Sequence, residues 1–311
     1  GGATMSENEI VILSGARTAI GTFGGSLAAI PPIQLATTVT RAAIERAGIS
    51  PERIGTVVFG HVLNTEPRDA YLSRVAMLDA GVPNTTPAMN VNRLCGSGAQ
   101  AIVSATQALM LGDAEFAVAG GAESMSRAPY AVPSARFGAK MGDVQMFDMM
   151  VGALTCPMGT GHMGVTAENV AHEHDISRQA QDEFALESQK RAANAIAQGY
   201  FKEQIVPIEI KTRKGMVAFD TDEHPKATDL EKLAGLKPAF QKVGGTVTAG
   251  NASGINDGAG AIVLARAEAA KAAGAKPLFR VLGYAVAGVR PEVMGIGPVP
   301  AVEALLARTG L

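Results

Sequence analysis

The stretch "AMNVNRLCGSGAQAIVSATQALML", residues 88–111, decides how this chain folds around one of its two cysteines. Its first four residues, "AMNV", suit an extended strand, and "NRLCGSG" at 92–98 carries the glycines of a sharp turn. Residues 99–111 are so apolar that they predict a buried helix. The order strand, turn and helix therefore places Cys95 at the N-terminus of a helix.

A cysteine at that position can carry chemistry. Unpaired backbone N–H groups and the positive end of the helix dipole stabilise a thiolate, which is the nucleophilic form. The same N–H groups can hold an oxyanion, and Gly96 and Gly98 let a substrate approach closely. The alternative is a small buried hydrophobe, the usual role of a free cysteine. The pattern alone leaves both interpretations of Cys95 open.

Strands and helices alternate on both sides of this stretch. Residues 9–16, 53–63 and 114–123 read as strands, and residues 31–50 read as a helix that starts with prolines and closes at Gly48. This alternation predicts a layered α/β domain with largely parallel strands.

The regular alternation of strand and helix segments stops between residues 124 and 249, where Met, Gly and Pro interrupt it. We expect a long insertion that carries binding loops, with one helix capped by Ser177 and ended by Gly199. Beyond it, residues 251–274 return to the apolar style. There we expect a turn with Asn256 or Asp257 as the cap of an apolar helix, or a turn whose small side chains admit a slender ligand.

The end of the chain echoes its beginning, since residues 298–311 resemble residues 35–49. The first copy runs into a strand, whereas the second stops at Leu311, so we expect the natural protein to continue. The expected organisation is an N-terminal α/β domain whose first part is 5–123 and whose last part is 250–278. A loop domain at 124–249 interrupts it, and 279–311 start a truncated C-terminal α/β domain.

Composition excludes several classes of protein. The net charge is −2, which provides no field for nucleic acid or an anionic membrane surface. Two cysteines cannot build a disulfide framework, and "GGATMSENEIVIL" at 1–13 lacks the basic and long apolar regions of a signal peptide. No apolar run reaches membrane-spanning length. We therefore expect a cytoplasmic protein without a nucleic-acid or membrane partner.

Other motifs have weaker functional interpretations. Gly159, Gly161 and Gly164 have G-x-G-x-x-G spacing, but no strand is predicted before them, which argues against a nucleotide cradle. The run from His172 to Asp175 lacks metal-ligand spacing and fits a solvated helix start. Cys156 reads as buried filler, and His162 as a polar group beside a pocket or an ordinary loop histidine.

Six stretches together resemble the thiolase family, in the family's order and over nearly the whole chain from Ile10. The greatest similarity is to its biosynthetic β-ketothiolase (acetyl-CoA acetyltransferase) group. These stretches are "SGARTAIGTFGGSL" (14–27), "VNRLCGSGAQAI" (91–102), "GGAESMSRAPY" (120–130), "HMGVTAENVA" (162–171), "TAGNASGINDGAGA" (248–261) and "MGIGPVP" (294–300). The resemblance implies a duplicated α/β fold of five layers, α-β-α-β-α, with a loop domain inserted in the first half. The second half would be incomplete in this chain.

The resemblance also implies an acyl-CoA C-acetyltransferase with ping-pong chemistry. Cys95 would take an acyl group as a thioester, with its backbone N–H in the oxyanion hole. An enolate from acetyl-CoA would then attack it to give acetoacetyl-CoA or another short 3-oxoacyl-CoA, or the reverse. Coenzyme A thioesters would be substrates, with no metal or other cofactor, and the family suggests a homodimer or homotetramer.

The same resemblance implies a set of residues that bind coenzyme A. His162 would lie beside the pantetheine and the thioester, Ser253 would hydrogen-bond the pantetheine, and Lys226 would contact the nucleotide end. The walls of the pantetheine tunnel would be Leu154, Met163, Ala239, Phe240, Ala249 and Ala252.

The family pattern is interrupted at the C-terminus. Family members continue with an Asn-Glu-Ala-Phe segment, a Gly-His-Pro segment and a second cysteine followed by glycines, none of which occurs here. That histidine would activate Cys95 and that cysteine would be the general base. We therefore expect the chain as given to be inactive alone.

Two alternatives remain open at this point. One is a non-catalytic thiolase-like protein that binds acyl-CoA or lipid, which the intact cysteine turn disfavours. The other is a ketoacyl-synthase-like condensing enzyme, against which the Met-rich insertion and "HMGVTAENVA" argue.

Overall fold

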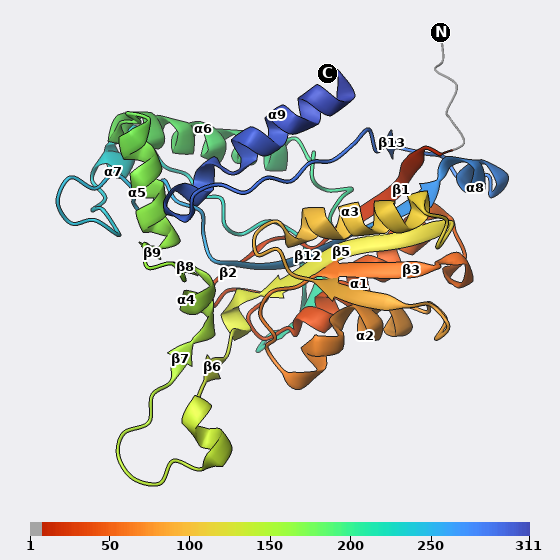
Figure 1. The fold of residues 1–311 in the computed structure, drawn as a ribbon, viewed down its shortest axis with the longest axis horizontal. Coiled ribbons are helices and arrows are strands. Elements are labelled where there is room, and N and C mark those ends of the chain that lie inside the picture. Colours follow the sequence, from red (N-terminus) through yellow and green to blue (C-terminus); the bar gives the residue numbers. More distant parts are fainter. Residues whose placement is uncertain (1–7) are drawn as a thin grey trace. The chain divides into compact units, whose positions relative to one another are not determined.

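The structure is a computed structural model that describes residues 8–311, so part of the N-terminal stretch discussed above lies outside the described residues. The chain divides into two compact units. The first contains the residues up to 128 together with 201–223 and 255–281, and the second contains 129–200, 224–254 and 282–311. Figure 1 shows the elements of both units.

The first unit is built on a seven-stranded sheet in the order β13-β1-β12-β5-β3-β4, with β2 paired to β12. Its strands are β1 (Ile10–Arg17), β2 (Gly21–Thr22), β3 (Thr56–Gly60), β4 (Ala88–Val91), β5 (Phe116–Ser124), β12 (Asn256–Arg266) and β13 (Phe279–Arg280). A separate two-stranded ribbon pairs β10 (Ile208–Thr212) with β11 (Gly215–Phe219).

The expectation of largely parallel strands is confirmed for β1, β3, β4 and β5, which run in one direction. The exception among the longer strands is β12, which lies between β1 and β5 and is antiparallel to both. β12 follows a non-helical segment, so no helical crossover forces it to run parallel to its neighbours. The expected cap at Asn256 or Asp257 is wrong, because these residues begin β12 instead of a helix. The small residues of β12 suit a central strand, because the neighbouring backbone leaves little room for side chains. A Cβ on Gly120 of β5 would lie 2.5 Å from the carbonyl oxygen of Gly260 in β12.

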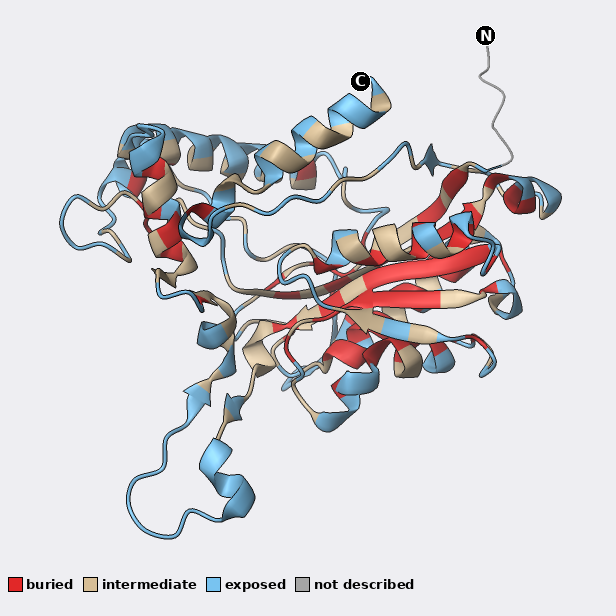
Figure 2. Ribbon diagram, in the orientation of Figure 1, coloured by how far each residue is buried: buried red, intermediate tan, exposed pale blue. Residues whose placement is uncertain are grey.

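Helices cover both faces of the sheet. They are α1 (Pro32–Ala47), α2 (Leu72–Asp79), α3 (Ser97–Met110) and α8 (Ala267–Ala272), with 3₁₀ turns η1 (Pro51–Arg53), η2 (Pro67–Tyr71) and η3 (Met125–Arg127). Val57 and Phe59 of β3 pack into a core with α1 and α2, whereas Val58 packs with α3. Successive strand residues therefore face opposite layers. Figure 2 shows that the inner strands of this sheet are mostly buried.

The second unit is mostly helical. It contains α4 (Met149–Ala153), α5 (Met163–Glu173), α6 (Arg178–Ala197), α7 (Leu230–Ala234) and α9 (Pro298–Thr309), with turns η4 (Pro133–Phe137) and η5 (Pro291–Ile296). Two short ribbons pair β6 (Tyr130–Ala131) with β7 (Phe147–Asp148), and β8 (Thr155–Cys156) with β9 (Gly161–His162). The capping predicted for α6 is confirmed, because Ser177 accepts the N–H of Ala180 and Gly199 has a φ of 72°.

Residues 201–223 differ from the expected boundaries, since they belong to the first unit and not with the rest of the insertion. The reason is ionic. Asp222 forms an ion pair with Arg17 of β1 at 2.8 Å and also accepts the N–H of Ile20. Glu223 accepts hydrogen bonds from the backbone and hydroxyl groups of Thr22 and Ser26. Within residues 8–311, no helix has the length and apolar character needed to cross a membrane.

Candidate active site

Cys95 lies in the turn that the sequence predicts. β4 ends at Val91, Gly96 is the N-cap residue of α3, and α3 begins at Ser97. The thiol is free and exposed, so the alternative interpretation of Cys95 as a buried hydrophobe is wrong. The elbow, defined as residues 92–97, therefore presents Cys95 to solvent one residue before a helix N-cap.

Backbone strain precedes the cysteine. Leu94 has a φ of 46°, in the left-handed region that a non-glycine residue rarely adopts. Such strain costs about 1–3 kcal/mol and persists where the surroundings over-determine it. Ser97 provides that support, because its hydroxyl donates to the Leu94 carbonyl at 2.6 Å and accepts the Arg93 N–H at 2.9 Å. Asn92 accepts the Leu94 N–H at 2.8 Å.

The end of β3 also supports the elbow. A Cβ on Gly60 would lie 2.6–2.8 Å from the backbone and Cβ of Ser97, so only glycine leaves room for the first residue of α3. The packing of Ser97 on Gly60 fixes the helix against the sheet.

The second cysteine has a different environment. Cys156 is buried, as expected. The backbone N–H of Met158 and the Thr160 hydroxyl hydrogen-bond its sulfur and lower the pKa of the Cys156 thiol. Its burial nevertheless limits the access of reagents.

The coenzyme A residues implied by the resemblance all belong to the second unit. His162 ends β9 and caps α5, where its Nδ1 accepts the Gly164 N–H at 3.0 Å. The neutral ring therefore carries its proton on Nε2. The ring stacks on Phe240 with centroids 4.6 Å apart. A Cβ on Gly164 would lie 2.1 Å from the Phe240 ring, so glycine is needed there.

The structure brings several of the other residues together. Met163 donates its N–H to the Leu154 carbonyl at 2.7 Å. Ala239 donates to Val247 at 2.9 Å, and Ala252 donates to Thr248 at 3.1 Å, which places Ala249 in the same loop. Ser253 and Lys226 are exposed, and the Lys226 N–H donates to Gln189 at 3.0 Å.

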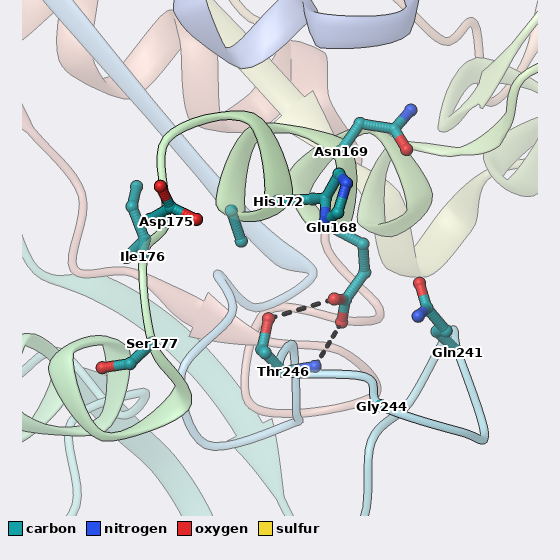
Figure 3. A pocket seen from close by; sticks show the side chains of 10 residues that line it. Glu168, Asn169, His172, Asp175, Ile176, Ser177, Gln241, Gly244 and Thr246 are labelled. Carbon is teal, nitrogen blue, oxygen red and sulfur yellow. Dashed lines mark hydrogen bonds between the residues drawn. The ribbon is translucent and has the colours of Figure 1, made fainter.

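Two buried carboxylates that the sequence reasoning missed hold this loop. Glu168 of α5 accepts the N–H groups of Thr246 and Val247 at 2.7 and 2.6 Å, together with the Thr246 hydroxyl. Asp182 of α6 accepts from Asn251 at 3.0 Å. Figure 3 shows Glu168 and Thr246 at a cavity of about 590 Å³. The sequence offered one sign of this arrangement, an acidic residue, Glu168, on the face of α5 that points inward. Its partners lie about 78 residues away, so the sign alone could not identify them.

Comparison with known proteins decides the family. The thiolase N-terminal domain family matches residues 10–268 of this chain. The chain belongs to the thiolase family.

Relatives of this thiolase agree. It is 58% identical over 304 residues to the β-ketothiolase BktB of Cupriavidus necator, covering 97% of this chain and 77% of the relative. It is 48% identical over 304 residues to an acetyl-CoA acetyltransferase of Escherichia coli, again covering 97% and 77%.

Solved structures give the same result. The Bacillus anthracis acetyl-CoA acetyltransferase matches this thiolase with a TM-score of 0.93 and 46% identity, covering 97% of this chain and 76% of the other. Human mitochondrial 3-ketoacyl-CoA thiolase in complex with CoA matches with a TM-score of 0.93 and 42% identity, covering 99% and 78%. The expected mixed α/β thiolase fold is confirmed.

The remaining motifs have structural roles in this thiolase. Gly159 and Gly161 have φ values of 91° and 118° around the β8–β9 turn, and neither follows a long strand. The run from His172 to Asp175 is exposed and ends α5, so the expected helix start is wrong. No cluster of three or more His, Cys, Asp or Glu residues that could hold a metal ion occurs in the described part of the chain.

Proposed function

We propose that this thiolase is an acyl-CoA C-acetyltransferase that makes or cleaves acetoacetyl-CoA or another short 3-oxoacyl-CoA through an acyl group on Cys95. The observation that carries this proposal is the exposed Cys95 in a strained elbow beside the N-terminus of α3. The names of the relatives, β-ketothiolase and acetyl-CoA acetyltransferase, support the same reaction class.

The reaction proceeds in two half-reactions. The Cys95 thiolate attacks the carbonyl carbon of an acyl-CoA, the carbon–sulfur bond to coenzyme A breaks, and coenzyme A leaves as its thiolate. A general base, the role that the family gives to its C-terminal cysteine, removes a methyl proton from a second acetyl-CoA. The resulting enolate carbon attacks the Cys95 thioester and displaces the Cys95 thiolate, and the removed proton ends on coenzyme A. A thioester suits this sequence because its carbonyl remains electrophilic and the exchange is reversible. Backbone N–H groups at the elbow stabilise the negative charge on the carbonyl oxygen.

The second unit binds coenzyme A in this proposal. Phe240 gives the pantetheine an apolar wall, and the Nε2–H of His162 donates to a carbonyl of the ligand. Ser253 hydrogen-bonds the pantetheine, and the exposed Lys226 attracts a phosphate group. The related human mitochondrial 3-ketoacyl-CoA thiolase was solved in complex with CoA, which supports coenzyme A as the ligand class.

We further propose that this thiolase is a homotetramer assembled through one hairpin, residues 130–148, whose two ends are the paired strands β6 and β7. This hairpin exposes Phe137 and Met141 by 90% and 99%. Apolar side chains gathered on a protruding segment are typical of protein interfaces.

Selective chemistry on the two cysteines tests the proposed nucleophile. Iodoacetamide should alkylate Cys95 much faster than Cys156, and acetyl-CoA should protect it. In a protein that also carries the family's C-terminal histidine, incubation with acetyl-CoA should add one acetyl mass, which Cys95→Ala should abolish and Cys156→Ala should retain. The 311-residue chain alone should gain no acetyl mass. Equal, slow alkylation of both cysteines without protection by acetyl-CoA would contradict a catalytic role for Cys95.

A further inference from the structure

Three ionisable side chains gather at the edge of the sheet that carries the elbow. His61 directly follows β3, Glu123 lies near the end of β5, and Asp69 lies in η2. β3, β4 and β5 are parallel, so their carboxyl ends meet at one edge. The His61 N–H donates to the Val91 carbonyl at 3.1 Å, at the last residue of β4 before the elbow.

The hydrogen bond at Nδ1 determines one proton of His61. The residue is 5% exposed, and its Nδ1 lies 2.8 Å from the Ala122 carbonyl oxygen. A carbonyl oxygen only accepts, so Nδ1 carries a proton. Glu123 Oε2 lies 3.4 Å from the same nitrogen.

The other ring nitrogen faces an anion. Among the described residues, Nε2 of His61 and Oδ1 of Asp69 are buried atoms without a hydrogen-bond partner. Nε2 lies 4.0 Å from Asp69 Oδ2, and that carboxylate is fully buried. Oδ2 accepts from the N–H and hydroxyl of Thr65 and from the N–H of Glu66, which stabilises its ionised form.

A neutral His61 does not fit these surroundings. With its single proton on Nδ1, it would turn the Nε2 lone pair toward the buried carboxylate of Asp69. A second proton on Nε2 replaces that repulsion with a charge-assisted attraction. It also places a cation beside Glu123, which accepts the N–H groups of Val62 and Leu63 at 2.8 and 3.0 Å.

We propose that His61 is held doubly protonated between Asp69 and Glu123, and that this charge positions the strand ends that support the Cys95 elbow. The titratable groups that face His61 are Asp69 from η2 and Glu123 from β5, whereas β4 presents the Val91 carbonyl. Burial raises the pKa of the Glu123 carboxyl, and the His61 charge opposes that effect.

Two sets of contacts connect the His61–Asp69 pair to the elbow. Gly60, next to His61, packs against Ser97. Asn90 of β4 donates to the carbonyls of Asp69 and Ala70 at 3.3 and 3.1 Å and accepts the Ser73 N–H at 3.0 Å. Loss of the Nε2 proton would loosen η2 from β3 and thereby the end of β4, so His61 is a positioning residue.

The first experiment is ¹⁵N NMR of the whole chain labelled at histidine, with His61 assigned from the spectrum of His61→Gln. At about pH 7 the His61 ring should show two protonated nitrogens, and Asp69→Asn should return Nε2 to the unprotonated form at the same pH. A wild-type ring protonated on Nδ1 alone would overturn the proposal.

The second experiment measures positioning and needs no acyl transfer, so it stays informative if the proposed function fails. In a Cys156→Ala background, the rate of Cys95 alkylation by iodoacetamide is measured across pH for the protein with His61 and for His61→Gln. The first rate divided by the second should be about ten at low pH. This ratio should approach one at the pH where NMR shows that His61 loses its Nε2 proton. A ratio that does not change with pH would overturn the proposal.

One control variant and one substitute variant complete the test. His172→Gln removes an exposed histidine of α5 and should leave the rate unchanged. If His61→Gln does not fold, as judged by circular dichroism, Asp69→Asn should show the same pH-dependent ratio. An unchanged rate in a folded Asp69→Asn at every pH would overturn the proposal as well.

Discussion

The imidazole of His162 and the ring of Phe240 are stacked, with centroids 4.6 Å apart and planes inclined by 19°. The contact links the cap of α5 to the segment before the 246–252 loop. Gly164 fits beneath the Phe240 ring, because a Cβ there would lie 2.1 Å from it. Two residues of the proposed coenzyme A site, His162 and Phe240, therefore hold each other in place, and Gly164 leaves room for the ring.

Removing the ring should weaken coenzyme A binding. Phe240→Ala should raise the Kd for CoA about two- to tenfold, since a stacked pair contributes about 0.5–1.5 kcal/mol. Gly164→Ala should act in the same direction because its methyl group displaces the ring. Isothermal titration calorimetry with CoA measures both. Gly152→Ala is the matched control, since nothing lies within 4 Å of a Cβ at that position, and an unchanged Kd in Phe240→Ala would refute the assignment.

The strained elbow predicts a role for Ser97. Ser97→Ala removes the hydrogen bonds to Leu94 and Arg93 from a residue that is 5% exposed. The free energy of unfolding should fall by about 1–3 kcal/mol, and Cys95 should react more slowly with iodoacetamide because the turn loses its support. Urea unfolding and alkylation kinetics measure the two effects. Ser104→Ala on the same helix is the control, and equal behaviour of the two variants would count against a supporting role of Ser97.

The elbow was predictable because its signals are local. An extended run, two glycines and an apolar run follow one another within 88–111, and each acts on its own residues. The direction of β12 was not predictable, because Asn and Asp before an apolar run occur at the starts of helices and of strands alike. Only pairing with β1 and β5, which are distant in sequence, selects the strand.

The carboxylates that hold loops and strand ends were equally hidden from the sequence. Glu168, Asp182 and Glu123 look like ordinary surface acids until the fold places N–H groups or an imidazole beside them. The i,i+4 pair of Asp182 with Arg178 is local, but it looks like an ordinary ion pair on a helix surface. The other partners lie about 60–79 residues away, so no local pattern reports them.

Stability should fall in acid through Asp222 and Glu223. Burial alone would raise the pKa of both carboxyls, but Arg17 outweighs it for Asp222, and Ser26 and Thr22 outweigh it for Glu223. Both folded-state pKa values therefore lie below the ordinary 3.8 and 4.5. The stabilisation is complete above those ordinary values and is lost as pH falls through the lowered ones.

Urea unfolding between about pH 6 and pH 3 measures this dependence. Glu223→Gln should lower the midpoint at the upper end of that range and make its decline with pH less steep. Glu187→Gln, which alters an exposed ion pair with Arg191, should keep the wild-type slope. A slope that is identical in wild type and Glu223→Gln would show that the carboxylate does not contribute.

The exposed hairpin predicts how the proposed tetramer can be dissociated. Phe137→Ser together with Met141→Ser should reduce the assembly to a smaller species, because these side chains are 90% and 99% exposed in one chain and lose their apolar partners. Analytical ultracentrifugation measures the mass, and circular dichroism should show an unchanged fold. Met158→Ser, 74% exposed but outside the hairpin, should leave the mass unchanged. A double variant with the wild-type mass would place the interface elsewhere, and the hairpin's apolar side chains would then need another partner.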